Sequence, residues 1–194
     1  MKYLLVSAAL AVTSLAPAAA VAQAVPAAIV VVVDSNRAAN ECNACKTAAA
    51  SLRSQASAFE ARRTALNNQL APERKGIQTA VDALGSKEPD AALQARIKAF
   101  QTKAQAAEQE LGTTQQRLQS INLNILKQIK DKLDPAVQAV MARRGANLAV
   151  ETDNTLAHTA ALDVTNDVIA QLNSTLTSVS ATPLPQQQSA APSR

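Results

Sequence analysis

Apolar residues recur along the middle of the chain at alternating spacings of four and three, which is the pattern of a coiled-coil helix. The stricter run comprises Leu93, Ile97, Phe100, Ala104, Ala107, Leu111, Thr114, Leu118, Ile121 and Ile125. A looser run precedes it and comprises Leu52, Ala56, Phe59, Leu66, Leu70, Ile77, Val81 and Leu84. Turn-forming residues occupy positions 85–90 between the two runs. Because two helices joined by a short turn pack antiparallel, residues 40–133 are predicted to form one projecting helical hairpin.

Prolines set the expected interruptions of these helices. The first helix is expected from about Arg37 to Leu84 and should kink at Pro72, which lacks an N–H group and clashes with the preceding turn. The second is expected from about Asp90 to Lys132, and Pro135 then marks either a second kink or a helix restart. At about 1.5 Å per residue, the arm would extend roughly 60 Å from its base.

Strand-like segments lie on both sides of the hairpin. Residues 28–34 contain five consecutive β-branched residues, and residues 147–152 and 155–160 also read as short strands. A short helix is expected to end at Leu172, and residues 174–194 have the composition of a disordered tail. Three short strands make too small a core to stand alone, so the chain is expected to oligomerise through them. The fold class predicted is mainly α, with a small β-body.

The first 24 residues have the composition of a secretory signal peptide. Lys2 is followed by an apolar run and by the small-residue site Ala22-Gln23-Ala24, so cleavage is expected after Ala24. A membrane anchor is disfavoured, because Pro17 and many small residues interrupt the run. The exported chain is therefore expected to be soluble, with residues 25–173 as its one folded domain.

The formal net charge is +4, and basic residues outnumber acidic ones in the hairpin. The candidate client-binding positions in its distal half are Arg62, Arg63, Arg74, Lys75, Lys87, Arg96, Lys98 and Lys103. These cations are either an ordinary solvated surface or a basic arm for acidic polypeptides, an anionic membrane surface or lipopolysaccharide. Nucleic acid is excluded as a partner, because two Phe and no Trp provide no stacking platform and no nucleic-acid-binding motif is present.

Catalytic and cofactor motifs are not found in the sequence. The four glycines form no phosphate-binding loop, and His158 is the single histidine, so neither a metal site nor a cofactor is expected. Cys42 and Cys45 form a C-x-x-C pair, expected on one face of a helix. The pair is interpreted first as a local or interchain disulfide of an exported chain. Thiol–disulfide exchange, a reduced state and metal binding are the alternatives, and no thioredoxin-like context supports exchange.

Residues 163–173, Asp-Val-Thr-Asn-Asp-Val-Ile-Ala-Gln-Leu-Asn, resemble the closing motif of the OmpH/Skp family of periplasmic chaperones. The segments Ile29–Asp34 and Asn147–Val150 stand where that family places its strands, so the resemblance covers residues 28–173. The chain departs from the family at Pro72, at the two cysteines, and at Leu156-Ala157-His158, where relatives commonly have an aromatic residue.

The resemblance implies a homotrimer in which three hairpins hang from a shared β-body around a cavity. It further implies an ATP-independent periplasmic holdase, not an enzyme, that binds unfolded outer-membrane proteins. Two alternatives stand beside this expectation: a periplasmic coiled-coil protein with a structural or tethering role, and a thiol–disulfide redox protein that uses Cys42 and Cys45.

Overall fold

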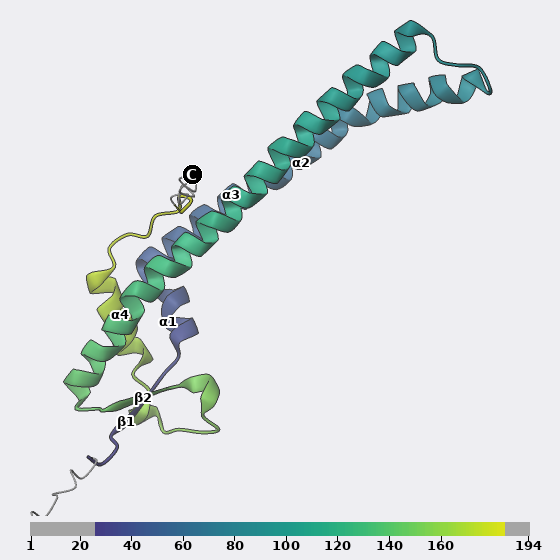
Figure 1. The fold of residues 1–194 in the computed structure, drawn as a ribbon. Coiled ribbons are helices and arrows are strands. Elements are labelled where there is room, and N and C mark those ends of the chain that lie inside the picture. Colours follow the sequence, from purple (N-terminus) through teal and green to yellow (C-terminus); the bar gives the residue numbers. More distant parts are fainter. Residues whose placement is uncertain (1–25, 185–194) are drawn as a thin grey trace, which may run out of the picture.

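The computed structural model describes residues 26–184, which form a small body at one end and a long arm at the other (Figure 1). The elements in chain order are β1 (Val30–Val33), α1 (Ser35–Glu41), α2 (Asn43–Leu84), α3 (Ala91–Arg144), β2 (Leu148–Glu151) and α4 (Thr165–Thr175). Two short 3₁₀ turns, Thr152–Asn154 and Ala160–Leu162, separate β2 from α4. Helices α2 and α3 pack antiparallel as the arm, so the predicted hairpin is confirmed. The predicted signal peptide lies outside the described residues.

The apolar seam of the hairpin lies where the spacing predicts it. Every residue of the stricter run on α3 is buried or half-buried. Of the looser run on α2, only Val81 near the tip is exposed, at 38%. The turn between the helices starts at Gly85, whose φ of 58° is a value that glycine adopts without strain. Asp90 then caps α3 by accepting a hydrogen bond of 2.8 Å from the N–H of Leu93.

The expected continuous first helix is wrong at one position, because Cys42 separates α1 from α2. Its ψ of 146° is extended, and it serves as the C-cap of α1 and the N-cap of α2. In the structure Cys42 and Cys45 are joined by a disulfide. Side chains three apart on an α-helix are about 5–6 Å apart at Cβ, whereas a disulfide brings Cβ atoms to about 3.5–4.5 Å. The backbone therefore leaves the helical conformation at Cys42.

The two internal prolines affect their helices differently. Both Pro72 in α2 and Pro135 in α3 lie inside helices that continue past them. Figure 1 shows the distal part of α2 turning away from α3, which agrees with the kink predicted at Pro72. Helix α3 runs on through Pro135, so no restart occurs there. The region around Pro135 packs against α4 and the body.

The body contains a two-stranded sheet in which β1 and β2 are parallel, with Val30 opposite Leu148 and Val33 opposite Glu151. The arm connects the two strands and returns the chain to its starting point, and Gly145 (φ 64°) ends α3 just before β2. The hydrophobic core lies here, where β1, α1, α4 and the proximal ends of α2 and α3 meet. Helix α4 contributes Val168 and Leu172, both fully buried.

The third predicted strand, residues 155–160, is not formed, and this prediction is wrong. β1 pairs with β2 and also makes a bridge between Val32 and Asp163. Residues 155–160 pair with neither β1 nor β2 in the part of the chain described. They form an exposed loop instead, in which the side chain of Leu156 is fully exposed.

The prediction of a disordered tail from residue 174 is wrong for its first part. Helix α4 continues to Thr175, and Leu176 is buried in the core. Residues 176–184, which we call the strap, then run along the proximal part of the hairpin and hydrogen-bond to it (Figure 1). Composition alone predicts disorder here, because it contains no information about contacts between this segment and the helix pair. Residues 185–194 lie outside the described residues.

Candidate functional site

The distal half of the arm carries the predicted client-binding cations. Its apolar seam is thin: Leu66, Leu93 and Ala107 are buried there, whereas Phe100 and Leu111 are half-buried. Two helices packed without a third layer leave both sides of their seam open to solvent. The arm therefore presents apolar side chains beside charged ones along its length.

Three of the eight predicted cations are held in ion pairs. Arg62 makes two hydrogen bonds to Glu110, of 2.6 and 2.9 Å, which join α2 to α3. Lys103 pairs with Glu73 at 2.9 Å and also joins the two helices, while Arg63 pairs with Glu60 of its own helix at 2.6 Å. The hydrogen bonds with Arg62 lower the pKa of Glu110, and the same bonds raise the pKa of Arg62. Glu73 is half-buried and the other five residues are exposed, so each pair adds little stability.

The other five cations are exposed and make no ion pair within residues 26–184. They are Arg74, Lys75, Lys87, Arg96 and Lys98. The Arg96 guanidinium lies beside Gly76 of α2, where a Cβ atom would stand 3.5 Å from it. Unpaired cations on a projecting arm are free to attract an anionic or acidic partner at a distance.

Shallow grooves flank the distal seam on its two sides. The larger, of about 410 Å³, is lined by side chains that include Asn67, Phe100 and Ala104, with Arg74 at its rim. The smaller, of about 270 Å³, has the ion-paired Arg62 and Lys103 beside it. Both share an apolar floor of Leu66, Leu70 and Ala107. Open grooves with apolar floors and charged rims suit weak contacts with a polypeptide better than the enclosure of a small substrate.

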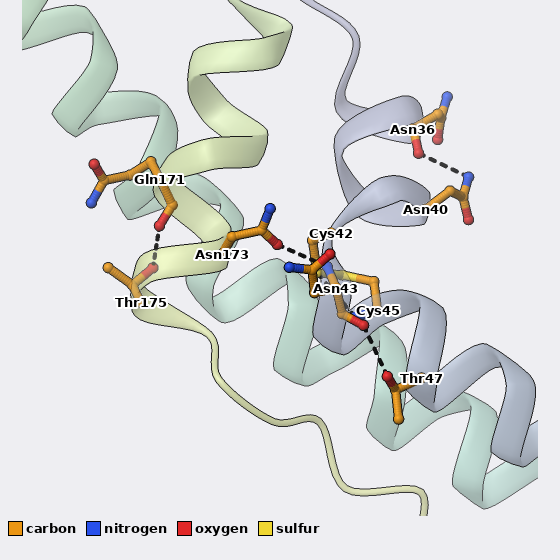
Figure 2. Close-up of a disulfide and its surroundings, with 9 residues drawn as sticks. All are labelled: Asn36, Asn40, Cys42, Asn43, Cys45, Thr47, Gln171, Asn173 and Thr175. Carbon is orange, nitrogen blue, oxygen red and sulfur yellow. Dashed lines mark hydrogen bonds between the residues drawn. A yellow bond between two sulfur atoms is a disulfide. The ribbon is translucent and has the colours of Figure 1, made fainter.

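The disulfide lies at the root of the arm (Figure 2). Cys42 and Cys45 are only 0% and 2% exposed, and the N–H of Cys45 donates to Sγ of Cys42 at 3.1 Å. The N–H of Asn43, the first residue of α2, donates to Oδ1 of Asn173 on α4 at 2.8 Å. The disulfide thus lies where α1, α2 and α4 meet, and its sulfur atoms are shielded from solvent.

His158, predicted on a strand, lies in the exposed loop after β2. Among residues 26–184, no group of His, Cys, Asp or Glu side chains is arranged to hold a metal ion. Within the same range, none of the helices has an apolar stretch sufficient to cross a membrane.

The sequence reading missed a second polar site, on the proximal arm. Gln55 of α2 and Ser120, Asn124 and Gln128 of α3 all hydrogen-bond to the strap. The α3 residues recur every four positions, each just before one of Ile121, Ile125 and Ile129 in the seam. An uncharged polar stripe beside an apolar one was a visible signal, although nothing in the sequence showed what it binds.

The chain was compared with known proteins. Residues 29–172 match a family model described as outer membrane protein (OmpH-like). Among solved structures, the fold is similar to that of a candidate outer membrane chaperone (OmpH-like) from Caulobacter crescentus CB15. The identity is 20%, the TM-score is 0.68, and the match covers 85% of this chain and 96% of that chain. No curated protein matches the chain.

Proposed function

The chain belongs to the OmpH-like outer membrane protein family, and on this premise we propose that it is an ATP-independent periplasmic holdase for unfolded outer-membrane proteins. The observation that carries the proposal is the distal arm, with its open apolar grooves and five unpaired cations. Such a surface holds a chain by many weak contacts, which need no nucleotide to be formed or released.

We further propose that three copies assemble through the body. A two-stranded sheet is marginal by itself, and the body exposes Ile29 at 54% and Leu148 at 46%. A groove of about 400 Å³ lies beside this sheet, lined partly by Val33, Val137 and Ala149. In a homotrimer these surfaces would be covered, and three arms would share one client. Because the three arms bind one client at the same time, contacts that are weak individually hold it tightly together.

A periplasmic location agrees with two features. The signal peptide predicted at residues 1–24 would direct export, and a disulfide such as Cys42–Cys45 persists in oxidising compartments. Burial of both cysteines favours a structural role for the bond over thiol–disulfide exchange, because exchange requires an accessible sulfur. The unpaired cations would also suit an anionic membrane surface, which flotation with anionic and with zwitterionic vesicles would test.

The test is suppression of aggregation. An unfolded outer-membrane β-barrel protein is diluted from urea at low salt, with the chaperone equimolar as trimer, and light scattering is followed. We expect suppression. No suppression, together with tight binding to a single folded partner, would support the tethering role instead.

Two matched charge variants locate the surface. In one, the five unpaired distal cations become Gln: Arg74, Lys75, Lys87, Arg96 and Lys98. In the control, five proximal cations without ion pairs become Gln: Lys46, Arg53, Arg117, Lys130 and Lys132. We expect the distal variant to suppress aggregation less at low salt, and the difference to shrink as salt screens the charges. If both variants suppressed aggregation to the same extent, the distal cations would not be the client-binding surface.

A further inference from the structure

The strap hydrogen-bonds to the arm through its own peptide groups, and its apolar side chains pack against the core. Gln128 makes a paired contact with Ser180: its Oε1 accepts the Ser180 N–H at 2.9 Å and its Nε2 donates to the Ser180 carbonyl at 3.0 Å. Asn124 donates to the carbonyl of Thr182 at 2.9 Å. Ser120 Oγ accepts the N–H of Leu184 at 3.0 Å. In each contact the arm contributes a side chain and the strap contributes a peptide group.

Helix α2 adds a contact from the other side. Nε2 of Gln55 donates to the carbonyl of Ala181 at 3.3 Å, so the strap is bonded to both helices of the hairpin. Peptide groups are the same in every polypeptide. A surface that hydrogen-bonds to the N–H and C=O groups of an extended chain can therefore bind many sequences, as sheet edges do when they bind an added strand.

The side chains of the strap alternate in the manner of an extended segment. Val179 and Ala181 are half-buried against the hydrophobic core, whereas Ser178, Ser180 and Thr182 are exposed. Strands of outer-membrane barrels show the same alternation of apolar and polar residues, because one face meets lipid and the other the lumen. Residues 178–182 of the strap thus have the side-chain alternation of one such strand.

We propose that the proximal face of the hairpin is a binding track for extended segments of unfolded β-barrel proteins, and that the strap occupies this track in cis. The track consists of Gln55, Ser120, Asn124 and Gln128 with the neighbouring apolar seam. This assignment rests on the holdase function proposed above and adds a second contact region to the distal arm. A client must displace the strap, so the strap lowers the apparent affinity and favours clients that offer several segments at once.

The experiment releases the strap by a single substitution. Ser180→Pro removes the N–H that Gln128 accepts, while the rest of the full chain is kept. Ser178→Pro is the matched control, since the N–H of Ser178 makes no hydrogen bond in the part of the chain described. Hydrogen exchange at Leu184, whose N–H donates to Ser120, reports release in every variant. The Kd for a labelled, urea-unfolded β-barrel protein is measured by fluorescence anisotropy.

We expect Ser180→Pro to bind the unfolded protein about three- to tenfold more tightly, as for a site that is free roughly 10 to 30% of the time. Ser178→Pro should bind as the unsubstituted chain does. A chain that ends at Thr177 should reproduce the gain. Adding Gln128→Met to Ser180→Pro should abolish it, whereas adding Gln119→Met, at an exposed position of α3 outside the track, should leave it intact.

The outcomes separate the two proposals. Client binding by the unsubstituted chain, with no gain after the strap is released, overturns the track and leaves the holdase function standing. A gain that survives Gln128→Met also overturns the track. Absence of client binding in every variant overturns both.

Discussion

At the scale of single residues, three neighbours in the closing motif lock the root of the arm. The N–H of Val164 donates to the carbonyl of Val32 at 2.9 Å. The buried hydroxyl of Thr165 accepts the N–H of Asp34 at 3.0 Å, and Asp163 accepts the N–H of Thr165 at 2.8 Å. Asp34 in turn caps α1 through the N–H of Arg37 at 2.7 Å. The motif joins the entry of the first helix to the start of the last.

Asp163 gives this lock a pH dependence. Hydrogen bonds from Thr165 hold the pKa of Asp163 below its ordinary value of 3.8, and the charges of Arg37 and His158 act in the same direction. A lowered pKa means that the ionised carboxylate stabilises the folded state above about pH 3.8, and that this stabilisation is lost as pH falls through the folded-state pKa. We expect Asp163→Asn to lower Tm by a few degrees at pH 7 and by less near pH 3, in melts followed by circular dichroism. The control is Asp153→Asn, which is exposed. A deficit that grows on acidification would contradict the prediction.

The cysteine pair contributes to stability and not to client capture, if the proposed function is right. Replacing both Cys42 and Cys45 by Ala removes a short covalent loop, and the chain-entropy model assigns such a loop about 2 kcal/mol. We expect a lower Tm that no longer responds to reductant. Aggregation suppression, measured below the new Tm, should stay within about twofold of the unsubstituted chain, in proportion to the fraction folded. Loss of suppression in a folded variant would revive the redox alternative.

At the scale of elements, the surroundings of a helix decide what a proline does to it. Both prolines are exposed on their helices. Pro135 lies in the part of α3 that packs against α4 and the body, and α3 continues through it. Pro72 lies in the distal half of α2, the half that turns away from α3 toward the tip (Figure 1). Proline removes the same kind of backbone hydrogen bond in both cases, but the distal arm has fewer neighbouring elements to oppose a bend.

Replacing Pro72 by Ala should straighten α2 and bring its distal part closer to α3. The substitution restores an N–H that can bond to the carbonyl of Asn68, and alanine is preferred over proline by about 3 kcal/mol inside a helix. We expect slower hydrogen exchange over residues 73–84, measured by mass spectrometry. Pro135→Ala is the matched control and should leave exchange at the tip unchanged. Unaltered exchange in Pro72→Ala would show that proline does not set the mobility of the tip.

At the scale of the whole molecule, a single chain leaves much of its body uncovered. Residues 156–162 are exposed, with Leu156 at 105%, and no strand pairs with them. The segment predicted as a strand at residues 155–160 pairs with neither strand, and the chain makes a single bridge to β1 only later, at Asp163. In the proposed trimer, these residues would have neighbouring copies to contact.

We expect the exposed loop at residues 156–162 to lie in the contact between the copies of the trimer. Light scattering combined with size-exclusion chromatography should give three times the mass of one chain. Leu156→Glu should weaken the assembly and give dissociation at low micromolar concentration, because it places a charge where apolar contact is expected. Leu123→Glu is the control, since Leu123 is also exposed (57%) but lies on α3. A monomer for the unsubstituted chain would overturn the proposed architecture, and equal mass in both variants would place the contact elsewhere.

The helical hairpin and the strand before it can be predicted from the sequence alone. The hairpin follows from the heptad spacing and from the turn at residues 85–90, and the first strand follows from the β-branched run before the first helix. Each of these depends on local periodicity and propensity. The same sequence shows the distal cations but not which are paired, since Arg62–Glu110 and Lys103–Glu73 join residues far apart in the chain.

Only the tertiary structure decided three other features. The break at Cys42 follows from the geometry of a disulfide inside a helix, and the chain after β2 returns to the sheet at the bridge between Val32 and Asp163 and not at residues 155–160. The strap is ordered because side chains on two helices bond to its backbone. Each depends on contacts across the fold, and the free energy of such contacts does not appear in the composition or the local pattern of either partner.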